Sequence, residues 1–204
     1  MKKTIFLTLC LVMISSAFME KENITACATA VVTVIDLPQE VKEQIPENYS
    51  VLKIAHGNLN RDQFDDLVVV LKKNGEEESS DVIEHPEKRP LLLFIAQPDS
   101  SYKLAAKNDN VVLCYDCGGM MGDPFTGIAI KNGYFSLEHY GGSGWRWTRI
   151  ITFKYSTEKN DWFLHKDGGD SFHSGNPDNV ETNVKTIKDF GVVPFSDFNV
   201  YDEE

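Results

Sequence analysis

The sequence has few basic residues, few cysteines and, after its first residues, no long apolar segment. Its 204 residues include 20 Lys and Arg against 31 Asp and Glu, a formal net charge of -11. A chain this acidic repels phosphate groups, so we expect no nucleic-acid partner. The acidity suits cation binding or simply solubility. No stretch after residue 17 is long and apolar enough to predict a transmembrane segment.

The usual sequence patterns of catalytic and zinc sites are also lacking. No phosphate-binding glycine loop precedes a helix, no HxH or HxxxH pair occurs, and Ser143 lies between strands rather than at a strand-to-helix turn. We interpret the glycine-rich stretch with Asp167, Asp170 and His173 as a turn rather than a metal site. The sequence therefore predicts no catalytic residues and favours a non-enzymatic protein.

The N-terminus has the pattern of a secretory signal peptide. Two lysines precede an apolar run at 5–14, and small residues follow at 15–17. We expect cleavage after Ala17, a linker over 18–29 and a single β-rich domain over 30–204. Loss of Lys2 and Lys3 leaves 18 basic against 31 acidic residues, a mature charge of -13. The chain is expected in the periplasm or outside the cell.

Three cysteines remain after that cleavage, and each allows an alternative. A lipid anchor at Cys27 is the rival to cleavage after Ala17, although the charged residues at 20–22 argue against it. Export permits disulfides, and we predict that Cys114 and Cys117 pair. A bridge from Cys27 to either of them stays open. Because GGMMGDP after CYDC is a poor helix start, a structural bridge is favoured over redox chemistry.

Strand patterns dominate the rest of the chain. An apolar run at 30–36 precedes one short helix at 38–45, and two groups of about four strands follow, over roughly 50–106 and 126–167. The Asn132-Gly133 turn places Ile130 opposite Phe135 and Ile128 opposite Leu137. The predicted fold is mainly β, with two antiparallel sheets packed as a sandwich or a partial propeller-like arrangement.

Three further features of the sequence lead to separate predictions. The charged segment 74–89 is interpreted as a mobile excursion. Arg149 interrupts the apolar face of its strand and needs a carboxylate partner or an escape to water. The tail from Val180 to Phe198 is ambiguous between a strand, a short helix and an extended cover over the sheets.

Residues 57–67, GNLNRDQFDDL, place oxygen donors at the spacing of a loop around a hard cation. The expected ligands of the metal are Asn58, Asn60, Asp62, the carbonyl of Phe64, and Asp66. The segment resembles the calcium loops of FG-GAP and VCBS-type repeats, which lead into a strand as this one does. The resemblance implies weak calcium binding.

The loop departs from that pattern at two positions. Asn58 replaces an aspartate, and Gln63 replaces the glycine whose positive φ the turn normally needs. The alternative is a turn whose Asn and Asp side chains hydrogen-bond their own backbone. The second half of the chain otherwise resembles small exported bacterial proteins with no assigned activity.

An aromatic and arginine cluster flanks the GGSG turn and is the expected contact site for a partner, through Tyr140, Trp145 and Arg146. Trp147 is expected in the core. The leading hypothesis is an exported, non-enzymatic β-domain that binds a protein or glycan partner and is stabilised by calcium. The first alternative is a periplasmic inhibitor or immunity-type protein against a cell-wall or effector enzyme. The second is a hydrolase, with Glu138 or Asp123 as its test residues.

Overall fold

The computed structural model describes residues 37–202, which all belong to one compact unit. The expected signal peptide, the linker, the apolar run at 30–36 and Cys27 therefore lie outside the described residues. Over 37–202, no helix has the length and apolar character needed to cross a membrane.

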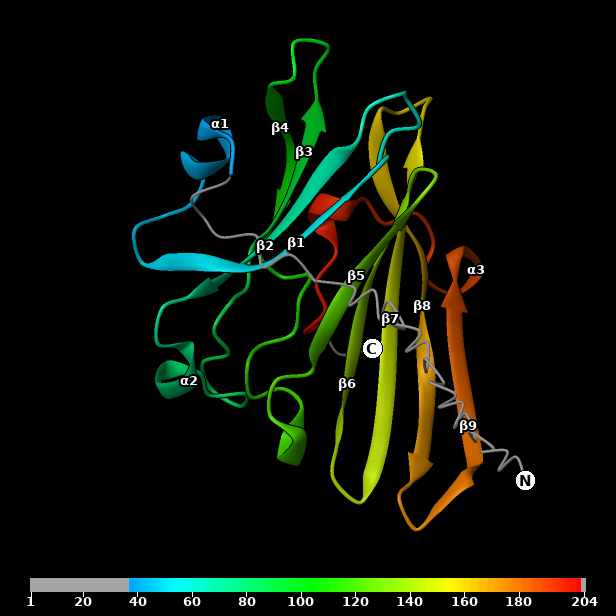
Figure 1. The fold of residues 1–204 in the computed structure, drawn as a ribbon. Helices are drawn as coiled ribbons and strands as arrows, with labels where there is room; N and C mark the ends of the chain where they lie inside the picture. The colour runs from blue at the N-terminus through cyan, green and yellow to red at the C-terminus, as the bar shows by residue number, and fades with distance from the viewer. Residues whose placement is uncertain (1–36, 203–204) are drawn as a thin grey trace, which may run out of the picture. The chain divides into compact units, whose positions relative to one another are not determined.

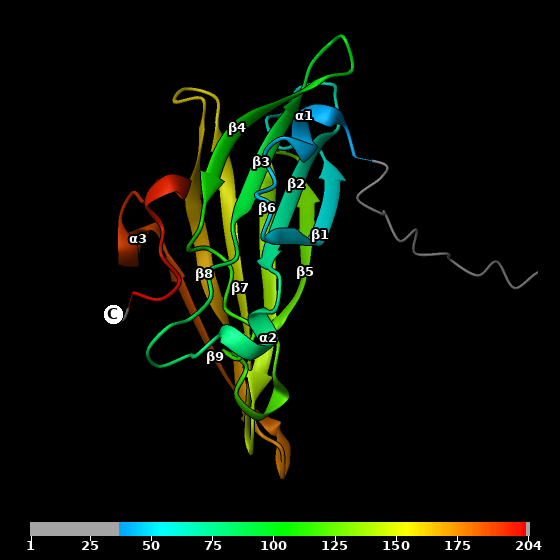
Figure 2. The ribbon, with the colours of Figure 1, turned by 90° about the vertical axis from the view of Figure 1, so that its left-hand side faces the viewer.

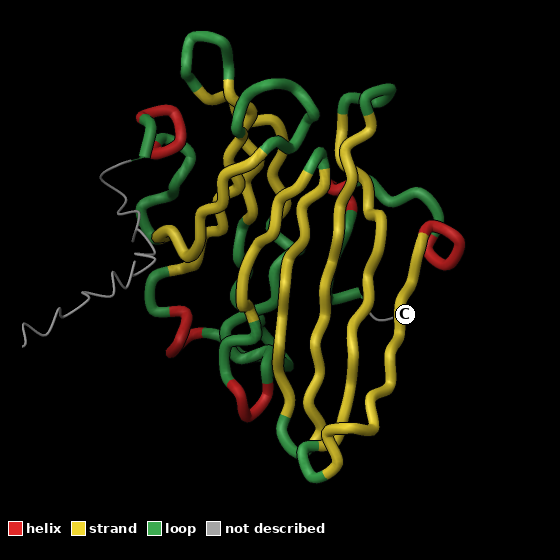
Figure 3. The backbone as a smooth tube through the Cα atoms, turned by 45° about the vertical axis from the view of Figure 1, so that its right-hand side comes forward, coloured by secondary structure: helices red, strands yellow, loops and turns green. Residues whose placement is uncertain are grey.

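Two antiparallel sheets make up this unit. The first has the order β1-β2-β3-β4 and the second the order β5-β6-β7-β8-β9. Figures 1 and 3 show the strands running side by side within each sheet. The strands of the first sheet are β1 (Tyr49–Gly57), β2 (Asp66–Lys73), β3 (Leu91–Ala96) and β4 (Tyr102–Asn108). Those of the second are β5 (Phe125–Lys131), β6 (Tyr134–Gly142), β7 (Trp145–Ser156), β8 (Asp161–His173) and β9 (Asn176–Thr186).

The helices are short and lie at the ends of strands or in loops. The α-helices have four residues each: α1 (Gln39–Lys42), α2 (Glu76–Ser79) and α3 (Ile187–Phe190). Two 3-10 turns, η2 (Gly119–Met121) and η3 (Phe195–Asp197), complete the described elements. The predicted helix at 38–45 is thus present as α1, and the prediction of one helix missed α2 and α3.

The two sheets face each other across one apolar core, as Figure 2 shows with β1–β4 in front of the second sheet. The predicted sandwich is confirmed, and the propeller-like alternative does not occur. The core also takes in residues from the C-terminal segment, and Phe195 contacts the rings of Phe135 and Phe153 edge-on at 5.7 and 5.2 Å between centroids. Its main members from the two sheets are Val68, Val70, Leu91, Leu93, Phe135, Leu137, Ile151 and Phe153.

The first sheet is buried on both of its faces. Leu67, Val69 and Leu92 point away from the second sheet into another apolar cluster, which Leu37 and Val41 of the α1 region cover. Burial on both faces explains why β2 and β3 read as continuous apolar runs without polar alternation. In the second sheet, β6 alternates between buried and half-buried positions, because its outer face is uncovered.

The predicted hairpin has the predicted register. Ile128 lies opposite Leu137 and Ile130 opposite Phe135. Asn132 and Gly133 both have positive φ, 50° and 78°, as a two-residue hairpin turn of this kind requires.

The later strands differ from the sequence prediction. Residues 167–173 do not form a turn, since β8 continues through them to His173. β9 follows as a fifth strand, and the ambiguous tail from Val180 onward therefore begins as a strand and then forms α3 and η3. The sequence analysis did not predict β9, because both faces of this strand are mostly exposed and its polar residues show no apolar alternation.

Arg89, directly before β3, is fully buried and uses all five of its N–H groups. Nε and Nη2 donate to the carboxylate of Glu76, which is buried as well. Nη1 and Nη2 donate to the two oxygens of Asp123 at 2.7 and 2.8 Å, and Nη1 also donates to the carbonyl of Leu113 at 3.2 Å. Burial works against the charged guanidinium, yet the hydrogen bonds to Asp123 and Glu76 raise the pKa of Arg89.

These contacts hold the loop segment 74–89 at both ends, in contrast to the mobile excursion that its composition predicted. Glu76 anchors the start of the segment, and Arg89 is its last residue. Asp123 comes just before β5, so the same guanidinium also joins the first sheet to the chain entering the second.

We expect Arg89→Met to lower the free energy of unfolding by about 3–5 kcal/mol, because it leaves two carboxylates without their buried partner. Arg149→Met is the matched control, since Arg149 also binds a carboxylate but keeps 33% of its side chain exposed. Its loss should cost about 1 kcal/mol or less. Urea denaturation of the three proteins measures both values, and equal losses would contradict this account.

His139 is a second buried polar group of the core. It lies on the inner face of β6, is 2% exposed and packs against Phe125, with ring centroids 5.7 Å apart. Neither ring nitrogen makes a hydrogen bond within the described residues. Burial, together with the positive charges of Arg149 and Arg89, lowers the pKa of His139 to about 4. The imidazole is therefore neutral at pH 7.

Stability should fall on acidification between pH 6.5 and about 4. In that window a histidine in the unfolded chain takes up a proton, whereas buried His139 does not. Protonation therefore stabilises the unfolded state relative to the folded one. Across the whole window the free energy of unfolding falls by roughly 3 kcal/mol, and one proton is taken up per molecule on unfolding. Urea denaturation from pH 7.5 to 4.5 measures the slope. His139→Leu should flatten it, whereas His85→Gln, at an exposed position, should leave it unchanged.

Candidate functional site

An open groove lies on the inner face of the second sheet, in the part that the first sheet leaves uncovered. Its lining comes wholly from residues 147–202, and its volume is about 580 Å³, within the range of ligand sites. β7, β8 and β9 form the floor, and the C-terminal segment 190–202 forms a wall. Figure 1 shows the lower parts of β7–β9 extending beyond β1–β4. We call this feature the inner-face groove.

Strand alternation decides which side chains reach the groove. Trp147 of β7 lies opposite Ser171 of β8, which in turn lies opposite Glu181 of β9. The next row on this face pairs Gly169 with Asn183, and the one after it pairs Asp167 with Lys185. The residues that alternate with these rows point to the outer face, where the Asp170 carboxylate accepts a hydrogen bond from the Thr182 hydroxyl at 2.6 Å. Asp167, Asp170 and His173 therefore do not converge on one site.

Arg149 connects the floor of the groove to its wall. Its Nε and Nη2 donate to the two oxygens of Asp167 at 2.9 and 2.6 Å, a bidentate pair. Its Nη1 donates to the backbone carbonyl of Val200 at 3.4 Å. The expectation that Arg149 needs a carboxylate is confirmed, and the same side chain holds the C-terminal segment beside the sheet.

Trp147 lies against a glycine that leaves room for its ring. A Cβ atom at Gly141 would come within 2.5 Å of the Trp147 ring, so a side chain there would displace the indole. Trp147 is half-buried and lines the groove, which differs from the core position that its pattern predicted. An indole at the floor of a polar groove can stack on a flat ligand.

The charge of the groove is mainly negative. Asp197 and Asp202 of the wall add to Asp167 and Glu181 of the floor, against the two cations Arg149 and Lys185. Asn183 and Asn199 supply neutral hydrogen-bonding groups. This surface suits a neutral or cationic polar ligand and repels an anionic one.

The three residues predicted for partner contact do not share one face of the sheet. Tyr140 and Arg146 lie on the outer face, both half-buried, and Nη1 of Arg146 is buried without a hydrogen bond in the described part of the chain. Trp145 lies on the inner face, is 55% exposed and contacts the His173 ring edge-on at 5.4 Å. The sequence grouped residues that alternate between two surfaces.

The segment predicted to bind calcium forms a network of turns. Asn58 accepts from the N–H of Arg61 and donates to the carbonyl of Asp62. The Asn60 side chain accepts from the N–H of Asp62 at 2.9 Å, and the Asp62 carboxylate accepts from the N–H of Phe64 at 2.7 Å. These are the local bonds of the alternative that the sequence left open.

Two features make the loop a poorer fit to calcium than the resemblance implies. The left-handed residue is Arg61, with φ 69°, and not Gln63, so the backbone turns two residues earlier than in the family pattern. The second feature is Asp66, which is fully buried. Its oxygens accept the N–H groups of Leu59 at 2.7 Å and Ala96 at 3.0 Å, and burial raises its pKa.

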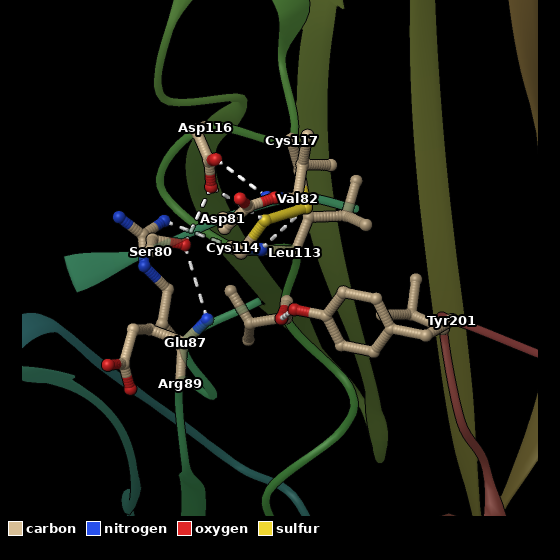
Figure 4. The surroundings of a disulfide bond; sticks show 12 residues. Ser80, Asp81, Val82, Glu87, Arg89, Leu113, Cys114, Asp116, Cys117 and Tyr201 are labelled. Carbon is tan, nitrogen blue, oxygen red and sulfur yellow. Dashed lines mark hydrogen bonds between the residues drawn. A yellow bond between two sulfur atoms is a disulfide. The ribbon is translucent and has the colours of Figure 1, made fainter. Parts of the chain in front are cut away.

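Cys114 and Cys117 form the predicted disulfide. The turn that it closes presents Asp116, whose carboxylate accepts from the hydroxyl of Ser80 at 2.6 Å and the N–H of Val82 at 2.8 Å (Figure 4). The bridged turn therefore holds the middle of segment 74–89. Near it the Tyr201 hydroxyl donates to the carbonyl of Val112 at 3.1 Å, and burial raises the pKa of Tyr201 to about 12.

The two carboxylates named for the hydrolase alternative lie in different places. Asp123 binds Arg89 through both oxygens, and Glu138 lies on the outer face of β6. Among residues 37–202, no three His, Cys, Asp or Glu side chains are grouped for metal binding.

Sequence reasoning missed the groove because it missed β9. The one available signal was Arg149, an arginine on an apolar strand face that requires a nearby carboxylate. Comparison of the chain with protein-family models, curated proteins and solved structures finds no match to any of them.

Asp66→Asn should lower the free energy of unfolding by about 1–3 kcal/mol in the presence of EDTA, because the buried N–H groups of Leu59 and Ala96 lose their charged acceptor. Asp62→Asn, in the exposed part of the loop, should change it little under the same conditions. Thermal unfolding measures both variants.

Added calcium decides the metal prediction in the same experiment. Calcium held by the loop raises the melting temperature of the unmodified protein, and Asp62→Asn removes that rise. An unchanged melting temperature together with no heat in a calcium titration rejects calcium binding.

Proposed function

We propose that this chain is an exported, non-enzymatic binding domain that takes a glycan in the inner-face groove. The observation that carries the proposal is the groove itself, in which Trp147 and apolar side chains such as Leu164 and Phe198 lie among carboxylate, amide and hydroxyl groups. A sugar ring has one apolar face and a rim of hydroxyls. An indole beside Asn, Ser and carboxylate groups offers a contact for each.

The geometry also limits which glycan fits. Four carboxylates against two cations repel sulfated or uronic-acid sugars and accept neutral or amino sugars. The C-terminal wall is anchored by Arg149, so the groove is formed before the ligand arrives, which reduces the entropy cost of binding. Export, which rests on the N-terminal sequence pattern, would bring the domain to extracytoplasmic glycans.

A second candidate is the inhibitor or immunity-type protein, and Trp145 supports it. This indole is 55% exposed at the end of the β6–β7 hairpin, on a strongly acidic chain. Exposed tryptophans are common anchors of protein interfaces, and net negative charge speeds association with a basic enzyme. The two candidates therefore depend on different tryptophans.

Asn183→Ala and Trp147→Ala should each weaken glycan binding at least tenfold, a loss of about 1.4 kcal/mol or more. Binding is measured by calorimetry with neutral, amino and acidic oligosaccharides. Trp145→Ala is the matched control and should bind glycans as the unmodified protein does. Asn183 is exposed on β9, so its substitution keeps the fold even where that of Trp147 does not.

Other results of these experiments would support a different function. Capture of a single basic enzyme that Trp145→Ala abolishes would support the inhibitor. Cleavage of an oligosaccharide during the titration would support a hydrolase. Binding to none of the three glycan classes would reject the proposal.

A further inference from the structure

Three of the four sheet edges in the described part of the chain lie beside another element. β1 of the first sheet lies next to β5 of the second, and β4 contacts η3. β9 differs from them, because among residues 37–202 its main contacts are with β8, on one side, and with α3, which directly follows it. No strand of the described part of the chain pairs with its other edge, and the backbone N–H and carbonyl groups of such an edge are the usual template for adding a strand.

The features of β9 that block such pairing lie at its two ends. Prolines, lysines and bulges are the common protections of an edge strand. Pro177 lies at the start of β9 and Lys185 near its end, but 178–184 contains neither proline nor a basic residue. From Val180 to Thr186 its register with β8 is regular. Val180 and Val184, on the outer face, are 48% and 44% exposed.

We propose that β9 pairs with β9 of a second copy of this chain, antiparallel about a two-fold axis at Thr182. The two five-stranded sheets then become one continuous sheet. The inference does not depend on glycan binding and goes beyond it.

The side chains of β9 favour this register. Directly opposite residues of an antiparallel pair share a face, so the axis must pass through a residue. With the axis at Thr182, each Val180 lies opposite Val184 of the other copy, and each Glu181 lies opposite Asn183. The diagonal neighbours of Glu181 in the other copy are then Lys185, within reach of a long side chain, and Glu181.

The neighbouring registers are less favourable. An axis at Glu181 places the two glutamates directly opposite each other, which is repulsive. An axis at Asn183 places Val180 opposite Thr186 and separates the two valines. Of these three registers, only the axis at Thr182 joins the exposed valines into one apolar strip, and it places no like charges directly opposite each other.

The dimer would also change the groove. Glu181, Asn183 and Lys185 line it from β9, so the inner-face grooves of the two copies would meet at the new strand pair. A ligand longer than one groove could then contact both copies.

Sedimentation of the purified protein over about a hundredfold range of concentration tests the proposal, because dimerisation follows mass action. We expect a mass twice that of the monomer at the upper end. Val180→Lys with Val184→Lys should raise the dissociation constant at least about tenfold, since it sets lysine opposite lysine twice. Val192→Lys, 61% exposed and outside β9, is the matched control and should leave the dimer intact.

A charge swap makes the test specific to the register. Val180→Glu with Val184→Glu should also be monomeric. An equal mixture of the lysine and glutamate double variants should form a heterodimer, because each lysine then faces a glutamate. A monomeric unmodified protein, an undiminished dimer in the lysine variant, or a mixture that stays monomeric would each overturn the proposal.

Discussion

The connection between the two sheets depends on the bidentate ion pairs that Arg89 makes with Glu76 and Asp123. A buried guanidinium is tolerated only when all of its donors are satisfied, and Arg89 satisfies all five. The two carboxylates come from separate loops, one at the start of α2 and one before β5. The loops at this end are therefore set by one charged group, and the disulfide turn adds a second attachment through Asp116.

Arg149 plays a related part within the second sheet. Its carboxylate partner, Asp167, lies in the second sheet, and its third contact is the backbone of the C-terminal segment. That segment also contributes Phe195 and Phe198 to the core. Its position is therefore fixed both by the hydrogen bond from Arg149 and by these buried aromatic side chains. The inner-face groove exists because the second sheet continues past this anchored segment and past the first sheet. Because the second sheet extends past the first, the edge of β9 is also left exposed. The candidate site and the proposed dimer strand therefore have one structural origin.

Much of the first eight strands could be predicted from sequence, since their signals are local. The Asn132-Gly133 turn specifies its own register, and the apolar runs of β2 and β3 reflect burial on two faces. The candidate site was less accessible. Tyr140, Trp145 and Arg146 looked like one cluster because they are close in sequence, yet alternation places Trp145 on the other face. The loop at 57–67 matched a calcium pattern by side-chain spacing, whereas its left-handed residue is Arg61.

The sequence by itself determined the two-sheet class, the β5–β6 hairpin and the need of Arg149 for an acid, because each follows from neighbours along the chain. The pairing of Cys114 with Cys117 was predicted beside an open alternative with Cys27, and the structure confirms it. Only the tertiary structure decided that β8 continues through its glycines, that polar β9 is a strand, and which carboxylates bind Arg89. The carboxylates that bind Arg89 lie 13 and 34 residues from it along the chain. β9 is a strand because the neighbouring strand β8 supplies its hydrogen bonds, and the mostly exposed residues of β9 carry no pattern that reports this.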